Sequence, residues 1–145
     1  MRLLLDINVL LDVVFNRPGA DASSKALDLC EDGSHQGEVA WHTLPTVYYY
    51  LEKSRTVQES WEFIENLTDI VHVVSAGHTE VKRAFDYGMK DFEDALQVSA
   101  AVTCQADFII TRNVADFAAS PVPSCTPEDF LAKFPPPAPL APAQP

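Results

Sequence analysis

The chain has 145 residues, of which 47% are hydrophobic and 21% charged, and its formal net charge is −11. This length suits one domain with a hydrophobic core of its own and requires no second domain. The acidic charge argues against a broad basic face for nucleic acid, because phosphate binding normally relies on Lys and Arg side chains that release counterions.

The apolar stretch at the start of the sequence is interrupted by Asp6 and Asp12. We therefore expect it to form a strand and a helix rather than a secretory signal or a membrane segment. The three cysteines show no C-x-x-C spacing and predict neither a disulfide framework nor a zinc site; they are Cys30, Cys104 and Cys125. We expect a cytoplasmic protein with reduced thiols and no membrane contact.

Short apolar or β-branched runs predict five strands, at residues 2–6, 39–41, 70–74, 107–110 and 121–124. Helical patterns separate them: a helix that ends near Phe15, then helices over residues 22–31, 43–53, 57–67, 79–87, 91–104 and 127–134. Strands that alternate with helices indicate βαβ units and a parallel sheet. Residues 1–134 form the predicted domain, and the proline-rich residues 135–145 are expected to be an extended tail.

Acidic residues gather where these elements begin or end. Asp6 closes the first predicted strand, polar residues within 111–116 follow the fourth, and Asp91 and Asp94 open the helix that precedes the fourth strand. The carboxyl ends of parallel strands meet at one edge, and an antiparallel helix begins at that same edge. Carboxylates are the ligands that hard divalent cations require. The pattern predicts a metal site that supplies positive charge where a phosphate would bind.

Each of these residues also has a simpler interpretation. Asp6 alone is a good helix N-cap, and Asp91 with Asp94 resembles a capping pattern. Asn113 and Asp116 alone would be ordinary turn formers. Their joint placement at one sheet edge favours the metal site.

Three motifs then resemble a known family. They are LLLDINVLLD at residues 3–12, DFEDALQ at 91–97 and ADFIITRNVADF at 106–117. The chain resembles a PIN domain, most closely the VapC-like toxin ribonucleases of bacterial toxin-antitoxin pairs. The resemblance implies a three-layer α/β/α sandwich around a central, mostly parallel five-stranded sheet. It also implies a Mg²⁺ or Mn²⁺ site that cleaves single-stranded RNA with metal-activated water.

The resemblance assigns roles by position. Asp6 and Asp94 match the first and third acidic ligands of the family, and Asp116 lies in its closing motif, so these three are the expected catalytic and metal-binding residues. Supporting roles fall to Asn8, Asp91, Thr111 and Asn113. Three basic residues beside the motifs are expected either to bind substrate phosphates or to be solvated surface charges: Arg17, Lys90 and Arg112.

One position departs from the family pattern. PIN toxins usually carry a glutamate in a run resembling T-L-x-E-L-Y-Y-V-L, and Thr46 occupies that place within residues 43–51. Glu52 is no substitute, because it lies about 120° away around the helix. A neutral hydroxyl predicts weaker metal binding. The alternative hypothesis is therefore a PIN-like module that binds RNA or protein without cleaving it.

Consecutive tyrosines at positions 48, 49 and 50 cannot all face one core, because successive helical residues point in directions about 100° apart. An outward Tyr would be either an amphipathic surface residue or part of an interface. We expect an interface with a second copy, as a homodimer, or with a cognate antitoxin. The four histidines show no ligand spacing and receive no role.

Two other α/β classes fit less well. A haloacid-type phosphatase requires D-x-D-x-T where this chain has Asp6, Ile7 and Asn8. A response-regulator receiver requires paired acids after the first strand and a late lysine that the sequence does not offer.

Overall fold

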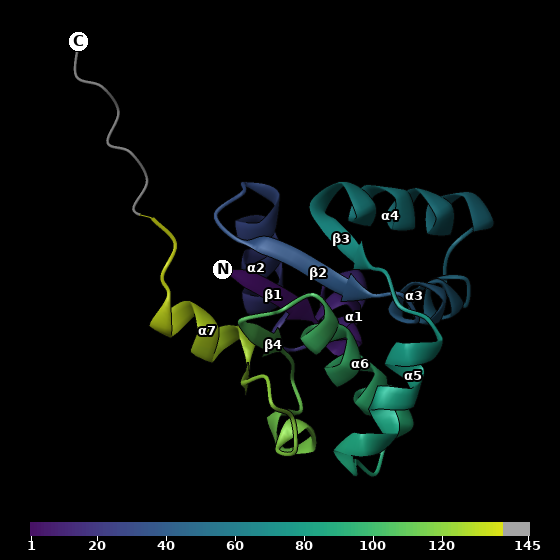
Figure 1. The fold of residues 1–145 in the computed structure, drawn as a ribbon. Helices are drawn as coiled ribbons and strands as arrows, with labels where there is room; N and C mark the ends of the chain where they lie inside the picture. Colours follow the sequence, from purple (N-terminus) through teal and green to yellow (C-terminus); the bar gives the residue numbers. More distant parts are fainter. Residues whose placement is uncertain (138–145) are drawn as a thin grey trace.

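The computed structural model describes residues 1–137 (Figure 1). Its five strands are β1 (Arg2–Leu5), β2 (Gln36–Ala40), β3 (Val71–Val74), β4 (Phe108–Ile110) and β5 (Ser124–Cys125). The helices are α1 (Ile7–Phe15), α2 (Ala20–Glu31), α3 (Thr43–Leu51), α4 (Val57–Ile70), α5 (His78–Ala84), α6 (Phe92–Thr103) and α7 (Pro127–Lys133). Two short 3₁₀ segments, Phe85–Tyr87 and Val114–Phe117, complete the described chain.

The strands form one sheet in the order β3-β2-β1-β4-β5, and all four pairings are parallel. β1 lies in the centre, paired with β2 on one side and with β4 on the other. Strand order reverses on either side of β1, so a crevice opens beyond its carboxyl end, where ligands bind in α/β sheets.

Helices cover both faces of the sheet. Leu3 and Leu5 point to one face, where they pack with buried residues of α1, α2, α3, α4 and α7. Leu4 points to the other face and packs with Val98 of α6 and Ile109 of β4. α5 and α6 lie together on this second side (Figure 1). The expected three-layer α/β/α sandwich with a five-stranded parallel sheet is confirmed.

The predicted strand at 39–41 was misplaced, since β2 spans Gln36–Ala40. The hydrophobic pattern did not reveal the start of this strand because its residues are polar. The carboxylate of Glu38 can be buried there because Arg2 Nε lies 3.4 Å from it. Trp41 lies beyond the strand and is 64% exposed.

The predicted edge strand at 121–124 also begins later, because β5 is only Ser124–Cys125. Pro121 and Pro123 lack the N–H that a strand would donate. The carbonyl of Pro123 nevertheless accepts from Ile109 N at 2.9 Å. Of the predicted tail, residues 138–145 lie outside the described part of the chain.

Candidate metal centre

Asp6 lies directly after β1, at the carboxyl edge of the sheet, and is the N-cap of α1. Its Oδ1 accepts from Ile7 N at 2.8 Å, and its Oδ2 accepts from the Thr111 hydroxyl at 2.9 Å. The side chain is only 2% exposed. The pKa of Asp6 is raised to about 6, chiefly by burial and also by the nearby charge of Glu93, while the Thr111 hydrogen bond opposes the shift.

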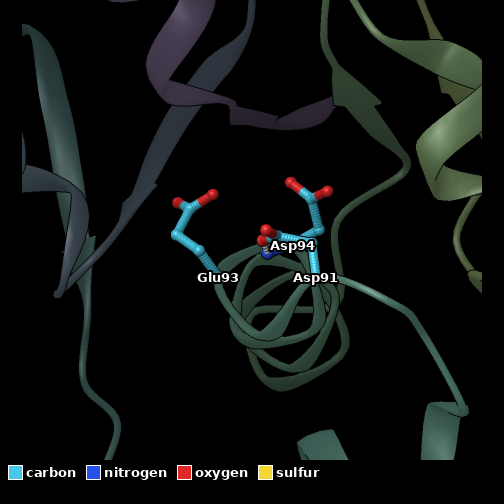
Figure 2. A group of neighbouring side chains, drawn as sticks. All are labelled: Asp91, Glu93 and Asp94. Atoms are coloured by element: carbon cyan, nitrogen blue, oxygen red, sulfur yellow. Dashed lines mark hydrogen bonds between the residues drawn. The ribbon is translucent and has the colours of Figure 1, made fainter.

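The first turn of α6 supplies three more carboxylates. Asp91 is the N-cap, and its Oδ1 accepts from Asp94 N at 3.0 Å. One carboxylate oxygen from each of Asp91, Glu93 and Asp94 lies within 4.8 Å of the other two. Figure 2 shows the carboxylates of Glu93 and Asp94 directed away from the helix toward the segment that joins β1 to α1, whereas the Asp91 carboxylate folds over the helix end, where it accepts from Asp94 N. Asp6 belongs to that segment.

Asp116 reaches the same region from the 3₁₀ segment that follows β4. A cleft of about 390 Å³ is lined by Asp91, Asp94, Asp116 and Lys90, with small residues from both segments. The structure thus brings Asp116 and Lys90 to the acidic start of α6. A larger hollow of about 720 Å³ lies at the opposite edge of the sheet, but its Asp107 carboxylate already accepts from Arg2 N at 2.7 Å.

Electrostatic coupling unites these carboxylates. The pKa of Asp94 is raised to about 7, first by burial and then by the negative charges of Asp91, Glu93, Asp6 and Asp116. Asp91 and Glu93 each bring a carboxylate oxygen within 4.8 Å of one of Asp94, and Asp116 lines the same cleft. Like charges at short range repel one another, so the ionised form of this carboxylate cluster is unfavourable without a cation.

The donor set suits a hard divalent cation. Among residues 1–137, neither Asp6, Asp91, Asp94 nor Asp116 forms an ion pair with Lys or Arg. A nearly buried carboxylate without a cationic partner is costly, and carboxylate oxygens are the ligands of Mg²⁺ and Mn²⁺. The residues therefore fit the cation that the sequence motifs imply.

The supporting residues lie around Asp6. The Asn8 amide approaches Asp6 Oδ2 at 3.5 Å, and the Thr111 hydroxyl holds the same oxygen. Asn113 contributes its backbone N–H, which donates to Thr111 Oγ1 at 3.1 Å, and its side chain is exposed. Asn8 and Thr111 thus orient the carboxylate of Asp6.

Arg112 is not placed to bind substrate, in contrast to the expectation from its position beside a motif. Its guanidinium pairs with Asp12 and Glu128 and donates to Ser23 Oγ at 2.9 Å. The reason is the burial of Asp12, which is 4% exposed and needs a compensating charge. Arg112 therefore joins α1, α2 and α7.

Arg17 also lies away from the acidic cleft. It borders a separate hollow with Asp21, Lys25 and Glu128, and its guanidinium carbon lies 5.6 Å from the centre of the Phe15 ring. Of the three basic residues considered, only Lys90 borders the acidic cleft.

The sequence reasoning missed Glu93 and its partner His42. Glu93 lies in the DFEDALQ motif, one position and therefore about 100° around the helix from Asp94, and the sequence analysis gave it no role. The longer Glu side chain nevertheless brings its carboxylate back to the cluster. Its Oε1 accepts from His42 Nε2 at 3.2 Å.

Aromatic residues of α3 and α4 form a second exposed feature. Tyr49 and Tyr50 project outward, as expected, whereas Tyr48 packs edge-on against Trp61 with ring centres 6.2 Å apart. Trp61 is itself 67% exposed. These two rings border an apolar hollow of about 240 Å³ that also includes Leu44, Pro45 and Ile64. Within residues 1–137, no helix is long and apolar enough to cross a membrane.

Comparison with known proteins agrees with this fold. The sequence profile of the PIN domain matches residues 2–115. The solved VapBC-1 from nontypeable Haemophilus influenzae is 18% identical, with a TM-score of 0.70 over 88% of this chain and 99% of that one. VapBC2 from Rickettsia felis, bound to a DNA fragment from its promoter, is 15% identical, with a TM-score of 0.69 over 87% and 98%. DNA-bound VapBC from Salmonella typhimurium is 15% identical, with a TM-score of 0.70 over 88% and 98%. No curated protein sequence matches the chain significantly.

Proposed function

The chain belongs to the PIN domain family, and from its acidic centre we propose that it is a Mg²⁺- or Mn²⁺-dependent endoribonuclease that cleaves single-stranded RNA. The observation that carries the proposal is the cleft in which Asp116 meets Asp91 and Asp94, with Asp6 buried at the end of β1. Asp6, Asp94 and Asp116 would hold the cation. When bound, the cation would lower the pKa of a water molecule and neutralise charge that develops on the phosphate.

The residues around the carboxylates have definite tasks in this proposal. Thr111 and Asn8 hold the carboxylate of Asp6 in one orientation through its Oδ2. Lys90 borders the cleft and would bind a neighbouring phosphate. Because the chain has a net charge of −11, the bound cation would supply the positive charge that attracts the substrate to this edge of the sheet.

Cleavage of a labelled single-stranded RNA tests the proposal. The native chain should cut it in Mg²⁺ or Mn²⁺ and stop on addition of a chelator, whereas Asp94→Asn should be inactive in the same buffer. Glu65→Gln, a change at an exposed residue of α4, serves as the control and should cut at the native rate. Equal cleavage by native protein and Asp94→Asn would trace the activity to a contaminating nuclease and remove the support for the proposal.

A second candidate, a module that binds RNA without cleaving it, is favoured by the state of Thr46. Its hydroxyl donates to the carbonyl of His42 at 3.0 Å, so it satisfies its own helix rather than the acidic cluster. Thr46→Glu separates the candidates. Cleavage by the native chain excludes the binding-only function, and cleavage by Thr46→Glu alone would support it.

We further propose that the chain is the toxin of a toxin-antitoxin pair and assembles with a cognate antitoxin, as a homodimer. Support comes from the fold shared with the VapBC structures and from the apolar hollow beside Trp61. The product of the adjacent reading frame, co-expressed with the chain, should purify with it, and Trp61→Glu should weaken the complex. Separate elution of the two native proteins would contradict the pairing.

A further inference from the structure

We propose that Glu93 is a cation ligand and that His42 and Gln97 hold it in position, an inference that rests on the proposed metal centre. Glu93 lies on α6 between two residues of the acidic cluster, and its carboxylate approaches those of Asp91 and Asp94 (Figure 2). Its charge also contributes to the raised pKa of the buried Asp6 carboxylate.

The hydrogen bonds of Glu93 favour this role. Both of them reach one oxygen: Oε1 accepts from His42 Nε2 at 3.2 Å and from Gln97 Nε2 at 2.9 Å. Within the described chain, Oε2 accepts none and remains available to a cation. Since an ionised carboxylate only accepts, His42 must carry its proton on Nε2 in this contact.

The side-chain amide of Gln97 is oriented toward Glu93. It is fully buried, and its amide nitrogen donates both to Glu93 and to Thr43 Oγ1, at 2.9 Å in each case. Its Oε1 has no hydrogen-bond partner among residues 1–137. The amide cannot turn over without placing its oxygen against the carboxylate of Glu93. A buried amide that leaves its oxygen unpaired is unfavourable, so orienting Glu93 accounts for its placement.

The network also explains how α3 contributes to the centre without a carboxylate of its own. His42 precedes α3 and Thr43 begins it, and both contact residues of α6 through side chains. Thr46 lies one turn beyond His42 on the same side of the helix. The negative charge beside the start of α3 therefore comes from Glu93 on α6, which accepts a hydrogen bond from His42.

Titration of the full chain with Mn²⁺, followed by the loss of the electron paramagnetic resonance signal of free Mn²⁺, tests the assignment. Glu93→Gln should weaken Mn²⁺ binding by about 10-fold or more, and Gln97→Leu by less, as for outer partners of metal ligands. Glu52→Gln, an exposed charge change at the end of α3, should bind as the native chain does. The chelator-treated Glu93→Gln protein should melt no lower than native, because a like charge has been removed.

The outcomes separate the two proposals. If the native chain binds Mn²⁺ and Glu93→Gln binds it equally well, while Asp94→Asn does not, Glu93 is not a ligand and the metal centre stands. If the native chain binds no Mn²⁺, the metal centre itself is wrong. Native affinity in Gln97→Leu, with weakened binding in Glu93→Gln, would remove only the positioning role of Gln97.

Discussion

Asp94 and Asp6 link the protonation of single residues to the stability of the fold. Both folded-state pKa values, about 7 and about 6, exceed the ordinary value of 3.8, chiefly because of burial. The folded state therefore binds more protons than the unfolded state between pH 4 and pH 7, and stability falls as pH rises through this window. Urea unfolding of the chelator-treated protein should show a decreasing midpoint from pH 5 to pH 8.

Asp94→Asn should remove most of this dependence, because asparagine has no ionised form to bury. Carboxyls whose pKa is lowered, such as Glu59 and Glu128, remain ionised across the window and contribute little slope. A urea midpoint of the native chain that increases from pH 5 to pH 8 would show that Asp6 and Asp94 do not dominate the pH dependence of stability.

Arg112 illustrates a residue with a structural role beside a functional motif. Arg112→Met would leave Asp12 buried at 4% exposure without its cationic partner. We expect a loss of about 3 kcal/mol in the free energy of unfolding, as for a broken buried ion pair. Urea denaturation measures it. Adding Asp12→Asn to this variant should recover part of the loss, and additive losses would argue against the pair.

Among the elements, α6 shows how one residue can serve two purposes. Asp91 caps the helix through Asp94 N and also borders the cleft. Asp91→Asn keeps a capping oxygen, so the chelator-treated variant should be as stable as native, whereas Asp91→Ala should lose about 1 kcal/mol. Urea unfolding in chelator distinguishes them. Equal stability of the two variants would mean that the cap contributes nothing.

The sequence predicts elements well where their ends carry local signals. The helix predicted at 91–104 is observed as α6 over Phe92–Thr103 because Asp91 caps it and the polar or apolar pattern is regular. The start of β2 was not predicted because Gln36 and Glu38, besides bonding to each other, take partners from Arg2 and His72, far away in the sequence. Glu93 was missed for the same reason, since His42 reaches it across 51 positions. Tertiary partners of polar residues leave no local pattern.

For the molecule as a whole, cation binding opposes the self-repulsion of a chain with a net charge of −11. Mn²⁺ at 100 times its dissociation constant should stabilise the folded state by about 2.7 kcal/mol. For a chain of this size, that corresponds to a melting temperature about 9 °C higher. Differential scanning fluorimetry measures the shift, with NaCl at matched ionic strength as the control. The same shift in NaCl would indicate screening alone.

The central position of β1 has a consequence during synthesis. Arg2 N donates to Asp107, 105 residues later, and the neighbouring Leu3 pairs with Phe108 of β4. During translation, the central strand β1 therefore emerges before the other strands, and its neighbour β4 emerges much later. For most of translation, the apolar strand β1 has no partner on the side where β4 will pair with it. Contacts between residues so far apart in the sequence also form slowly. Until β4 emerges, Asp6 also lacks Thr111, so the incomplete protein has no assembled centre.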